Sequence, residues 1–249
     1  MNSYRFQVWR QPRLDGLALG STDIHLWSIP LEGSDEYVGT HMKALSPEER
    51  QRAERFHFAR HRRRFTTARF FLRRLLSAYT GISAERLRFR YGPQGKPTLI
   101  DSKLHFNLSH SGELALLALN PSQPLGVDVE RLRPVTDALK IAQRFFSANE
   151  QEALLQTTEN QRDEAFMRCW TRKEAYIKAI GGGLSIPLHS FDVTLDQPPR
   201  FLSLENDRDK AHWWSLYHLE PRPGYLGALA VSGQNWCLTG YRTTIKMMI

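Results

Sequence analysis

Helical and strand segments alternate along the whole chain, which disfavours an all-helical bundle and an all-β sandwich. Up to residue 123, hydrophobic periodicity predicts a strand at 25–29, helices at about 46–58 and 60–79, and short strands at 87–91, 104–108 and 114–119. Beyond it, periodicity predicts a strand at 127–129, helices at 137–146, 148–155 and 162–180, and strands at 191–195, 213–219, 225–231 and 236–241. We therefore expect an α+β protein.

Start and stop signals delimit the main helices. Ser46-Pro47-Glu48-Glu49 combines a serine cap, a proline at the first helical position and a glutamate that completes a capping box. Ser147 and Glu150 form a second box of this kind. Gly81 ends the helix at 60–79, and Gly181–Gly183 end the helix at 162–180.

A weak internal repeat relates the two parts of the chain. The segments 112–118 and 224–230 both open with glycine, continue with small and apolar residues, and follow helix-and-strand stretches of similar order. The Pro/Ser-rich stretch 120–124 lies between them. We therefore expect one α+β half at 1–123 and a second at 124–249.

Composition is that of a globular protein. Hydrophobic residues make up 41% and charged residues 24% of the 249 positions. The longest unbroken apolar run, Leu114–Leu119, is far shorter than the ~20 residues that span a bilayer. No secretory signal pattern opens the sequence. The two cysteines, Cys169 and Cys237, make no disulfide framework, so we expect a reduced, cytoplasmic protein without membrane attachment.

The positive charge is concentrated in one block. Residues 50–74 hold ten arginines and a single acid, Glu54, so this block has a formal charge of +9. The remaining residues sum to −1, which gives the chain its net charge of +8. Guanidinium groups match phosphate oxygens bidentately, so the block suggests a phosphate or polyanion ligand. A solvated helix face and a nucleic-acid surface are the alternatives.

Two acids on a predicted strand are the first candidate for chemistry. In Gly126-Val127-Asp128-Val129-Glu130 the two carboxylates point to the same face, because strand side chains repeat every two residues. Adjacent carboxylates repel each other unless a positive group joins them, and such oxygen ligands suit Mg²⁺. The alternative is an ordinary half-exposed strand.

Glu174 and Lys178 form a second candidate pair. They are four residues apart on the predicted long helix and therefore share a face. Glu174 could serve as a third metal ligand or a base, with Lys178 as a nearby cationic acid. The alternative is a surface ion pair.

A polar cluster after a predicted strand is the third candidate. Phe106-Asn-Leu-Ser-His-Ser-Gly112 could present hydroxyls, backbone N–H groups and an imidazole to an anion. The alternative is a turn closed by local hydrogen bonds, which also applies to Gly95-Lys96-Pro97. The sequence contains no Walker loop, no Gly-x-Ser-x-Gly elbow and no zinc-ligand spacing.

The order of these motifs is more specific than any one of them. Taken together, they resemble the large, monomeric, Sfp-type class of the 4′-phosphopantetheinyl transferases over about residues 45–240. The motifs that carry the resemblance are Gly95-Lys96-Pro97, Phe106–Ser111, Gly126–Glu130, Arg144-Phe-Phe-Ser147 and Trp170-x-x-Lys-Glu-Ala-x-x-Lys178.

The resemblance implies two similar α+β halves packed as an intramolecular pseudo-dimer, with the active site in the cleft between them. It implies transfer of the phosphopantetheine arm of coenzyme A to a serine of an apo acyl- or peptidyl-carrier protein. The implied metal is Mg²⁺, with Mn²⁺ as an alternative, and the other product is adenosine 3′,5′-bisphosphate. The implied partners are coenzyme A and the carrier protein, without nucleic acid or membrane, and the enzyme is expected to be a monomer.

The resemblance also implies residue roles. Asp128, Glu130 and Glu174 match the metal-binding acids, Glu174 also matches the general base, and Lys178 matches the residue that assists the leaving group. The positions that match coenzyme A contacts are Arg52, Arg55, Arg64, Gly95, Lys96, Pro97, Ser109 and His110.

Three other functions stay open on the residues alone. A nucleic-acid-binding protein explains the arginines but leaves the acids unexplained. A Mg²⁺-dependent nuclease or phosphodiesterase explains the acids but not Lys178. A catalytically silent scaffold has no structural need for this set of acids and lysine.

Overall fold

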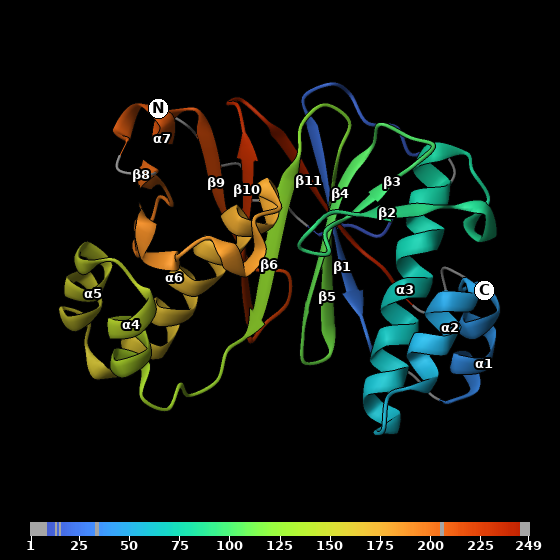
Figure 1. Cartoon of the computed structure of the whole chain (residues 1–249), viewed down its shortest axis with the longest axis horizontal. Coiled ribbons are helices and arrows are strands. Elements are labelled where there is room, and N and C mark those ends of the chain that lie inside the picture. The colour runs from blue at the N-terminus through green and yellow to red at the C-terminus, as the bar shows by residue number, and fades with distance from the viewer. Residues whose placement is uncertain (1–8, 13, 15, 33–34, 205–206, 245–249) are drawn as a thin grey trace.

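In the computed structural model, two sheets pack face to face, and a long helix covers the outer face of each sheet (Figure 1). The structure describes residues 9–12, 14, 16–32, 35–204 and 207–244. In the first half the elements are β1 (Asp23–Pro30), α1 (Asp35–Lys43), α2 (Pro47–Glu54), α3 (Ala59–Thr80), β2 (Phe89–Tyr91), β3 (Pro97–Leu99), β4 (His105–Ser111) and β5 (Leu114–Asn120), with a 3-10 turn at Ala84–Arg86.

The second half follows the same order, with one short helix inserted and one strand added at its end. Its elements are β6 (Leu125–Arg131), α4 (Ala138–Phe145), α5 (Ala148–Leu155), α6 (Glu159–Ile180), β7 (Phe191–Val193), β8 (Phe201–Leu204), α7 (Arg208–His212), β9 (Trp214–Leu219), β10 (Tyr225–Ser232) and β11 (Cys237–Arg242). Two 3-10 turns, Gly183–Ser185 and Leu188–Ser190, follow α6.

Sheet topology confirms that the two halves are similar. The order β1-β5-β4 in one sheet matches β6-β10-β9 in the other, with antiparallel neighbours in both. The helices α3 and α6 both have 22 residues, and each ends at a left-handed glycine, Gly81 or Gly181. The predicted α+β pseudo-dimer is therefore confirmed, and the segments 112–118 and 224–230 lead into the equivalent strands β5 and β10.

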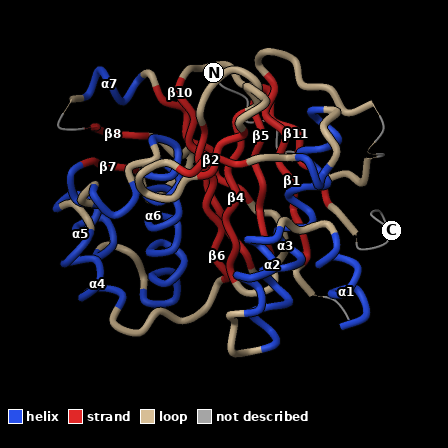
Figure 2. Tube along the Cα trace, turned by 45° about the vertical axis from the view of Figure 1, so that its right-hand side comes forward, coloured by secondary structure: helices blue, strands red, loops and turns tan. Residues whose placement is uncertain are grey.

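Three cores follow from the strand alternation. One face of β1, β5, β6 and β10 packs into a core between the two sheets. The opposite face of β1 and β5 packs under α3, and that of β10 packs under α6. Figure 2 shows the strands in the centre with helices on both sides. Because the central strands are covered on both faces, they are apolar almost throughout, as in β5.

The two predicted capping boxes are present and are tied to the long helices. The Ser46 hydroxyl accepts from the Glu49 N–H, and the Glu49 carboxylate accepts from the Ser46 N–H. Ser147 and Glu150 are arranged in the same way. Glu49 then pairs with Arg69 and Arg73 of α3, and Glu150 pairs with Lys173 of α6. In each half a short helix is thus locked to a long one.

Strand β11 belongs to the second half of the chain but lies in the sheet of the first half. β11 pairs in parallel with β1, so a strand from late in the chain completes the first-half sheet. The division into 1–123 and 124–249 stays a prediction; it separates β5 from β6, and β11 extends across it. Periodicity did not predict the short elements α1, β3, β8 and α7. Both cysteines are free, Cys169 buried and Cys237 exposed.

Candidate active site

The two predicted acids lie on β6, where the halves meet. Val127 and Val129 are fully buried in the core between the sheets. Asp128 and Glu130 therefore point to the opposite face, which α6 covers. Asp128 is buried and Glu130 is half-buried. The predicted common face is confirmed.

Side chains of β4 replace a backbone ladder along the adjacent edge of β6. The side-chain carbonyl of Asn107 accepts from the Val127 N–H at 2.8 Å. Two residues on, the Ser109 hydroxyl donates to Asp128 Oδ1 at 2.7 Å. Ser111 donates to Glu130 Oε2 at 2.5 Å and accepts from the next N–H of β6. Alternate residues of β4 thus hold the strand that carries the acids.

A glycine lets α6 lie directly on β6. A Cβ at Gly126 would stand 2.1 Å from the Ala175 carbonyl oxygen and 2.2 Å from the Ala179 nitrogen. Both are backbone atoms of α6, so no side chain fits there. The residues that face this contact include Glu174 and Lys178, whose positions on the helix flank Ala175 and Ala179.

Lys178 makes its ion pair across the junction. Its Nζ donates to Asp128 Oδ1 at 2.5 Å and to the Ser109 hydroxyl at 2.9 Å. The surface ion pair within the helix, which was the simpler alternative for Lys178, is not the contact observed. Three motifs that are distant in sequence therefore converge at one carboxylate.

Glu130 and Glu174 lie in an environment that disfavours their ionised forms. Burial raises the pKa of Glu174, and the charges of Asp128 and Glu130 raise it further. Burial also raises the pKa of Glu130, which the hydrogen bond from Ser111 partly opposes. The ammonium of Lys178 favours the ionised form of both glutamates. The group of acids has more negative charge than its surroundings balance.

The donor chemistry of these acids fits a divalent cation. Asp128 Oδ2 is buried without a hydrogen-bond partner, which is costly for a carboxylate oxygen unless a cation contacts it. Oxygen donors are what Mg²⁺ prefers. Among the residues that the structure describes, no three His, Cys, Asp or Glu side chains already enclose a metal position. The acids would therefore have to turn together around an ion.

Arg64 and His110 lie on the other side of this site. Desolvation lowers the pKa of His110, and the charges of Lys178 and Arg64 lower it further. Arg64 Nη2 is 3.6 Å from Glu113 Oε1, at the turn that follows β4. His110 is thus close enough to feel the charges of both Lys178 and Arg64, two groups on different halves of the chain.

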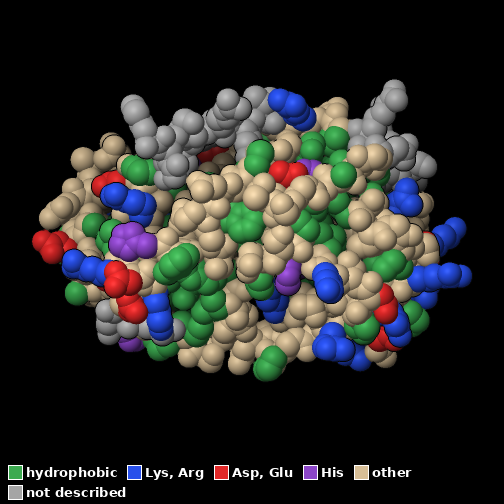
Figure 3. All heavy atoms as spheres, turned by 90° about the horizontal axis from the view of Figure 1, so that it is seen from above, with side chains coloured by type: hydrophobic (Ala, Val, Ile, Leu, Met, Phe, Trp, Pro, Cys, Tyr) green, Lys and Arg blue, Asp and Glu red, His purple; other side chains and the backbone are tan. Residues whose placement is uncertain are grey.

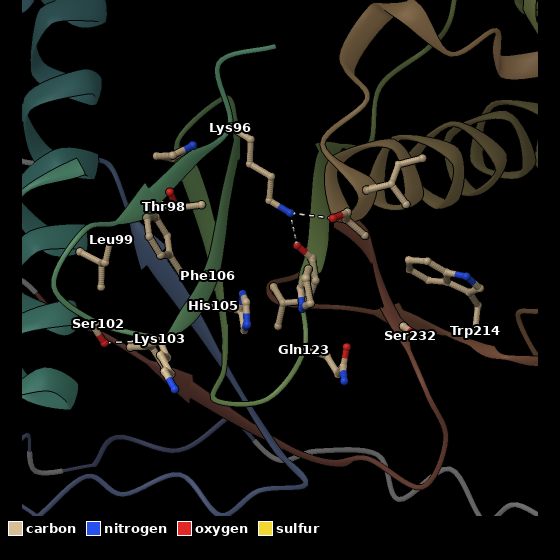
Figure 4. A pocket seen from close by; sticks show the side chains of 16 residues that line it. Lys96, Thr98, Leu99, Ser102, Lys103, His105, Phe106, Gln123, Trp214 and Ser232 are labelled. Atoms are coloured by element: carbon tan, nitrogen blue, oxygen red, sulfur yellow. Dashed lines mark hydrogen bonds between the residues drawn. The ribbon is translucent and has the colours of Figure 1, made fainter. Parts of the chain in front are cut away.

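The Gly95-Lys96-Pro97 motif forms the turn between β2 and β3. Gly95 has a φ of +81°, and its N–H donates to the Gly92 carbonyl. Lys96 extends its side chain to the second half (Figure 4), where Nζ donates to the Leu125 and Ala179 carbonyls. Pro97 is the first residue of β3.

The arginine block divides into two groups. Arg69 and Arg73 are largely buried against Glu49, so they stabilise the fold. Arg52 and Arg55 are exposed at the end of α2, and Arg52 packs on the Phe65 ring. Figure 3 shows Lys and Arg side chains gathered at its right-hand end, which belongs to the first half. No contact links Arg52 or Arg55 to the acids among the interactions of the described residues.

Sequence reasoning included Asn107 and Ser111 in a polar cluster but did not predict their hydrogen bonds to β6, and it missed the packing role of Gly126. The alternation Asn-x-Ser-x-Ser in β4 was the available signal, because it places three polar groups on one face of a strand. Their partners on β6 could not be inferred from the strand itself.

Among the described residues, no helix is both long and apolar enough to cross a bilayer.

Comparison with known proteins identifies the family. Residues 124–238 match the family model described as the 4′-phosphopantetheinyl transferase superfamily, and residues 32–122 match the model described as 4′-phosphopantetheinyl transferase, N-terminal. The 4′-phosphopantetheinyl transferase HetI of Nostoc sp. is 40% identical over 229 residues, which cover 90% of this chain and 94% of HetI. The 4′-phosphopantetheinyl transferase Sfp of Bacillus subtilis is 33% identical over 192 residues, covering 77% of this chain and 84% of Sfp.

The similarity extends over both halves and over nearly the full length of HetI, and the predicted resemblance is confirmed. The chain therefore belongs to the 4′-phosphopantetheinyl transferase superfamily.

Proposed function

We propose that the chain transfers the 4′-phosphopantetheine arm of coenzyme A to a serine of an apo acyl- or peptidyl-carrier protein. The observation that carries the proposal is the convergence of Ser109 and Lys178 on Asp128, beside Glu130 and Glu174. Membership of the family supports this reaction class. Adenosine 3′,5′-bisphosphate is the second product.

Glu174 is the proposed general base. The serine hydroxyl of the carrier protein attacks the β-phosphorus of coenzyme A and forms a new P–O bond, while the bond from that phosphorus to the bridging oxygen breaks. Glu174 accepts the serine proton, because an alcohol is a weak nucleophile without a base. A raised pKa makes the ionised carboxylate a better proton acceptor near neutral pH.

Lys178 is the proposed assistant of the leaving group. Its ammonium lies at the site, 2.5 Å from Asp128 Oδ1, and it can donate a proton or a hydrogen bond to the departing phosphate oxygen. Charge stabilisation and positioning supply most of the acceleration in phosphoryl transfer.

Asp128, Glu130 and Glu174 would hold Mg²⁺, with Mn²⁺ as a substitute. The orphaned Asp128 Oδ2 and the three-carboxylate donor set support this assignment. When bound, the ion would neutralise the diphosphate oxygens. Ser109 and Ser111 orient two of the three acids.

Coenzyme A is the proposed co-substrate. Arg64 and His110 would contact its 3′-phosphate, with Arg52 and Arg55 as further basic contacts, because charge-assisted guanidinium bonds suit phosphate. The family resemblance implies further contacts at Gly95, Lys96, Pro97 and Ser109. One chain supplies both sides of the site, so we expect a monomer that needs neither nucleic acid nor a membrane.

Intact-mass spectrometry of an apo carrier protein tests this function. The carrier is incubated with the enzyme, coenzyme A and Mg²⁺, and we expect a mass gain of one phosphopantetheinyl group that chelator abolishes. Cleavage of nucleic acid without coenzyme A would support a nuclease instead. Absence of both transfer and coenzyme A binding by the folded protein would overturn the proposal.

A further inference from the structure

The β2–β3 hairpin of the first half reaches across to the end of α6 in the second half. Lys96, at the turn of this hairpin, directs its side chain over the cavity shown in Figure 4. Its Nζ donates to the Ala179 carbonyl at 2.8 Å and to the Leu125 carbonyl at 3.0 Å. Ala179 is the penultimate residue of α6, and Leu125 is the first residue of β6.

These two carbonyls belong to elements that must be held together. The last four carbonyls of a helix have no partner within the helix, and a cation at the C-terminus is favoured by the helix dipole. The Lys96 ammonium therefore satisfies one free carbonyl of α6 and ties it to the start of β6. Burial lowers the pKa of Lys96 to about 8. The neutral amine still has two N–H donors, so both bonds can persist above that pH.

A second contact joins the same hairpin to the loop after α6. A Cβ at Gly183, where φ is +52°, would stand 2.7 Å from Cβ of Gln94. A Cβ at Gly181 would stand 3.5 Å from Cδ of Lys96. Gly183 therefore lets the hairpin turn pack against the loop after α6, whereas a Cβ at Gly181 would make only an ordinary contact with Lys96.

The clamped end of α6 carries the catalytic lysine. Lys178 immediately precedes Ala179, and Gly126 immediately follows Leu125, so the bonds of Lys96 lie beside the close contact between α6 and Gly126 of β6. A small shift of this end would move Lys178 Nζ away from Asp128.

We propose that Lys96 is a positioning residue, whose ammonium fixes the end of α6 on β6 and thereby places Lys178 beside Asp128. This inference rests on the proposed function for its catalytic consequence. A coenzyme A contact, the role that the family resemblance implies for Lys96, leads to a different outcome in the test below.

The experiment compares Lys96→Met with Lys103→Met. Methionine keeps the apolar stem of Lys96 but removes both donors. Lys103 is an exposed lysine that lines the same cavity, so it controls for the loss of a positive charge. Hydrogen exchange of the amides at 177–183, the dissociation constant for coenzyme A, and kcat and KM are measured for both variants.

For K96M we expect amide exchange at 177–183 to accelerate by about tenfold. The loss of a hydrogen bond to a charged group shifts a local opening equilibrium by a factor of about that size. We expect kcat to fall by about tenfold, while coenzyme A affinity and KM stay within about twofold of wild type. K103M should leave all of these quantities unchanged.

Weaker coenzyme A binding with unchanged exchange at 177–183 would overturn the proposal and make Lys96 a ligand contact. If K96M does not fold, Lys96→Arg takes its place, and its retained donors should preserve most of the protection. If the wild-type protein transfers no phosphopantetheine, the proposed function fails, whereas the exchange measurement still tests the clamp.

Discussion

Asp128 is the side chain on which the site converges. One carboxylate oxygen accepts hydrogen bonds from Ser109 and Lys178, and the other is buried without a partner. Such an arrangement is costly for folding, because a buried carboxylate oxygen without a partner loses its hydration. The unsatisfied oxygen is the clearest single-residue sign that the site accepts another ligand.

Glu174→Gln separates the catalytic and structural roles of that residue. We expect transfer to fall to near background, because glutamine accepts no proton. A pKa raised in the fold means that ionised Glu174 lowers stability at neutral pH, and that this cost disappears as the pH falls through the raised pKa. The metal-free variant should therefore melt no lower than wild type at pH 7.5, and any advantage should vanish in acid.

Thermal scans and carrier-transfer rates across pH check this. The wild-type rate should decline in acid at a pH above that typical of an exposed glutamate, because the base must be ionised. A clear loss of stability in Glu174→Gln at neutral pH would contradict the assignment of the shift to burial.

Arg64→Ala tests the 3′-phosphate assignment. Arg64 is near His110 and has about one-third of its side chain exposed, so it can meet a ligand without unfolding the helix. We expect KM for coenzyme A to rise by about tenfold, the loss of a charge-assisted bond, and KM for the 3′-dephosphorylated analogue to change little. Steady-state kinetics on the two substrates check this, and equal effects would refute the assignment.

The sequence largely predicted which residues carry the chemistry, but not which side chains contact each other. Strand alternation placed Asp128 and Glu130 on one face because that rule is local. The partner of Lys178 depends on how α6 lies on β6, which is a tertiary property, so helix spacing suggested Glu174 and the structure instead has Asp128.

At the level of elements, the contact between α6 and β6 determines the site. The helix backbone lies against Gly126, with no space for a methyl group. A long helix packed this closely on a strand presents its side chains at fixed positions along it. The register between the two elements therefore decides which side chains meet.

Gly126→Ala should displace α6. The added Cβ would meet backbone atoms at 2.1 and 2.2 Å, which cannot move aside as a side chain can. We expect the free energy of unfolding to fall by about 2–3 kcal/mol, as for overpacking in a core, with transfer lost in the folded fraction. Denaturant unfolding measures it. Gly92→Ala is the matched control, because the nearest atom to its Cβ is 3.7 Å away.

The buried pair Lys173–Glu150 holds α5 to α6. The two side chains are 2.7 Å apart and almost fully buried. Lys173→Met should cost about 3–5 kcal/mol, because it leaves a buried carboxylate without its cation. Adding Glu150→Gln should recover part of the loss, since it removes the unpaired charge. Its single amide oxygen can still accept from one of the two N–H groups, those of Ser147 and Val193, which bond to separate carboxylate oxygens. Chemical denaturation of both variants tests this, and simple additivity would contradict it.

The ends of the helices were the most predictable feature of the elements, because capping residues nearby in the sequence determine them. Both capping boxes and the glycine stops at Gly81 and Gly181 occur where sequence places them. The three-residue strand β3 and the five-residue helix α7 are too short for a periodic signal, and tertiary packing determines them.

For the whole molecule, the two halves are alike in topology but different in charge. The exposed arginines of the block at 50–74 lie on or beside α2 and α3 of the first half, and the acids of the site lie on β6 and α6 of the second. A negatively charged ligand entering the junction would be attracted by one half and held, through a cation, by the other. The block has more arginines than one phosphate requires.

Salt dependence follows from this charge distribution. We expect kcat/KM for an acidic carrier protein to fall as ionic strength rises, because exposed charges are screened beyond about 10 Å at 0.1 M salt. At saturating carrier concentration, kcat should change little. Initial rates over a range of NaCl concentrations check this. Insensitivity of kcat/KM to salt would show that the surplus arginines play no part in encounter.

The pairing of β11 with β1 has a consequence for how the protein is made. β1 is synthesised well before β11, so the first-half sheet has an unfilled edge until β11 has been made. An open strand edge is prone to pair with other chains. The nascent protein therefore depends on β11 to close that edge, and a chain truncated before Cys237 would be prone to aggregate.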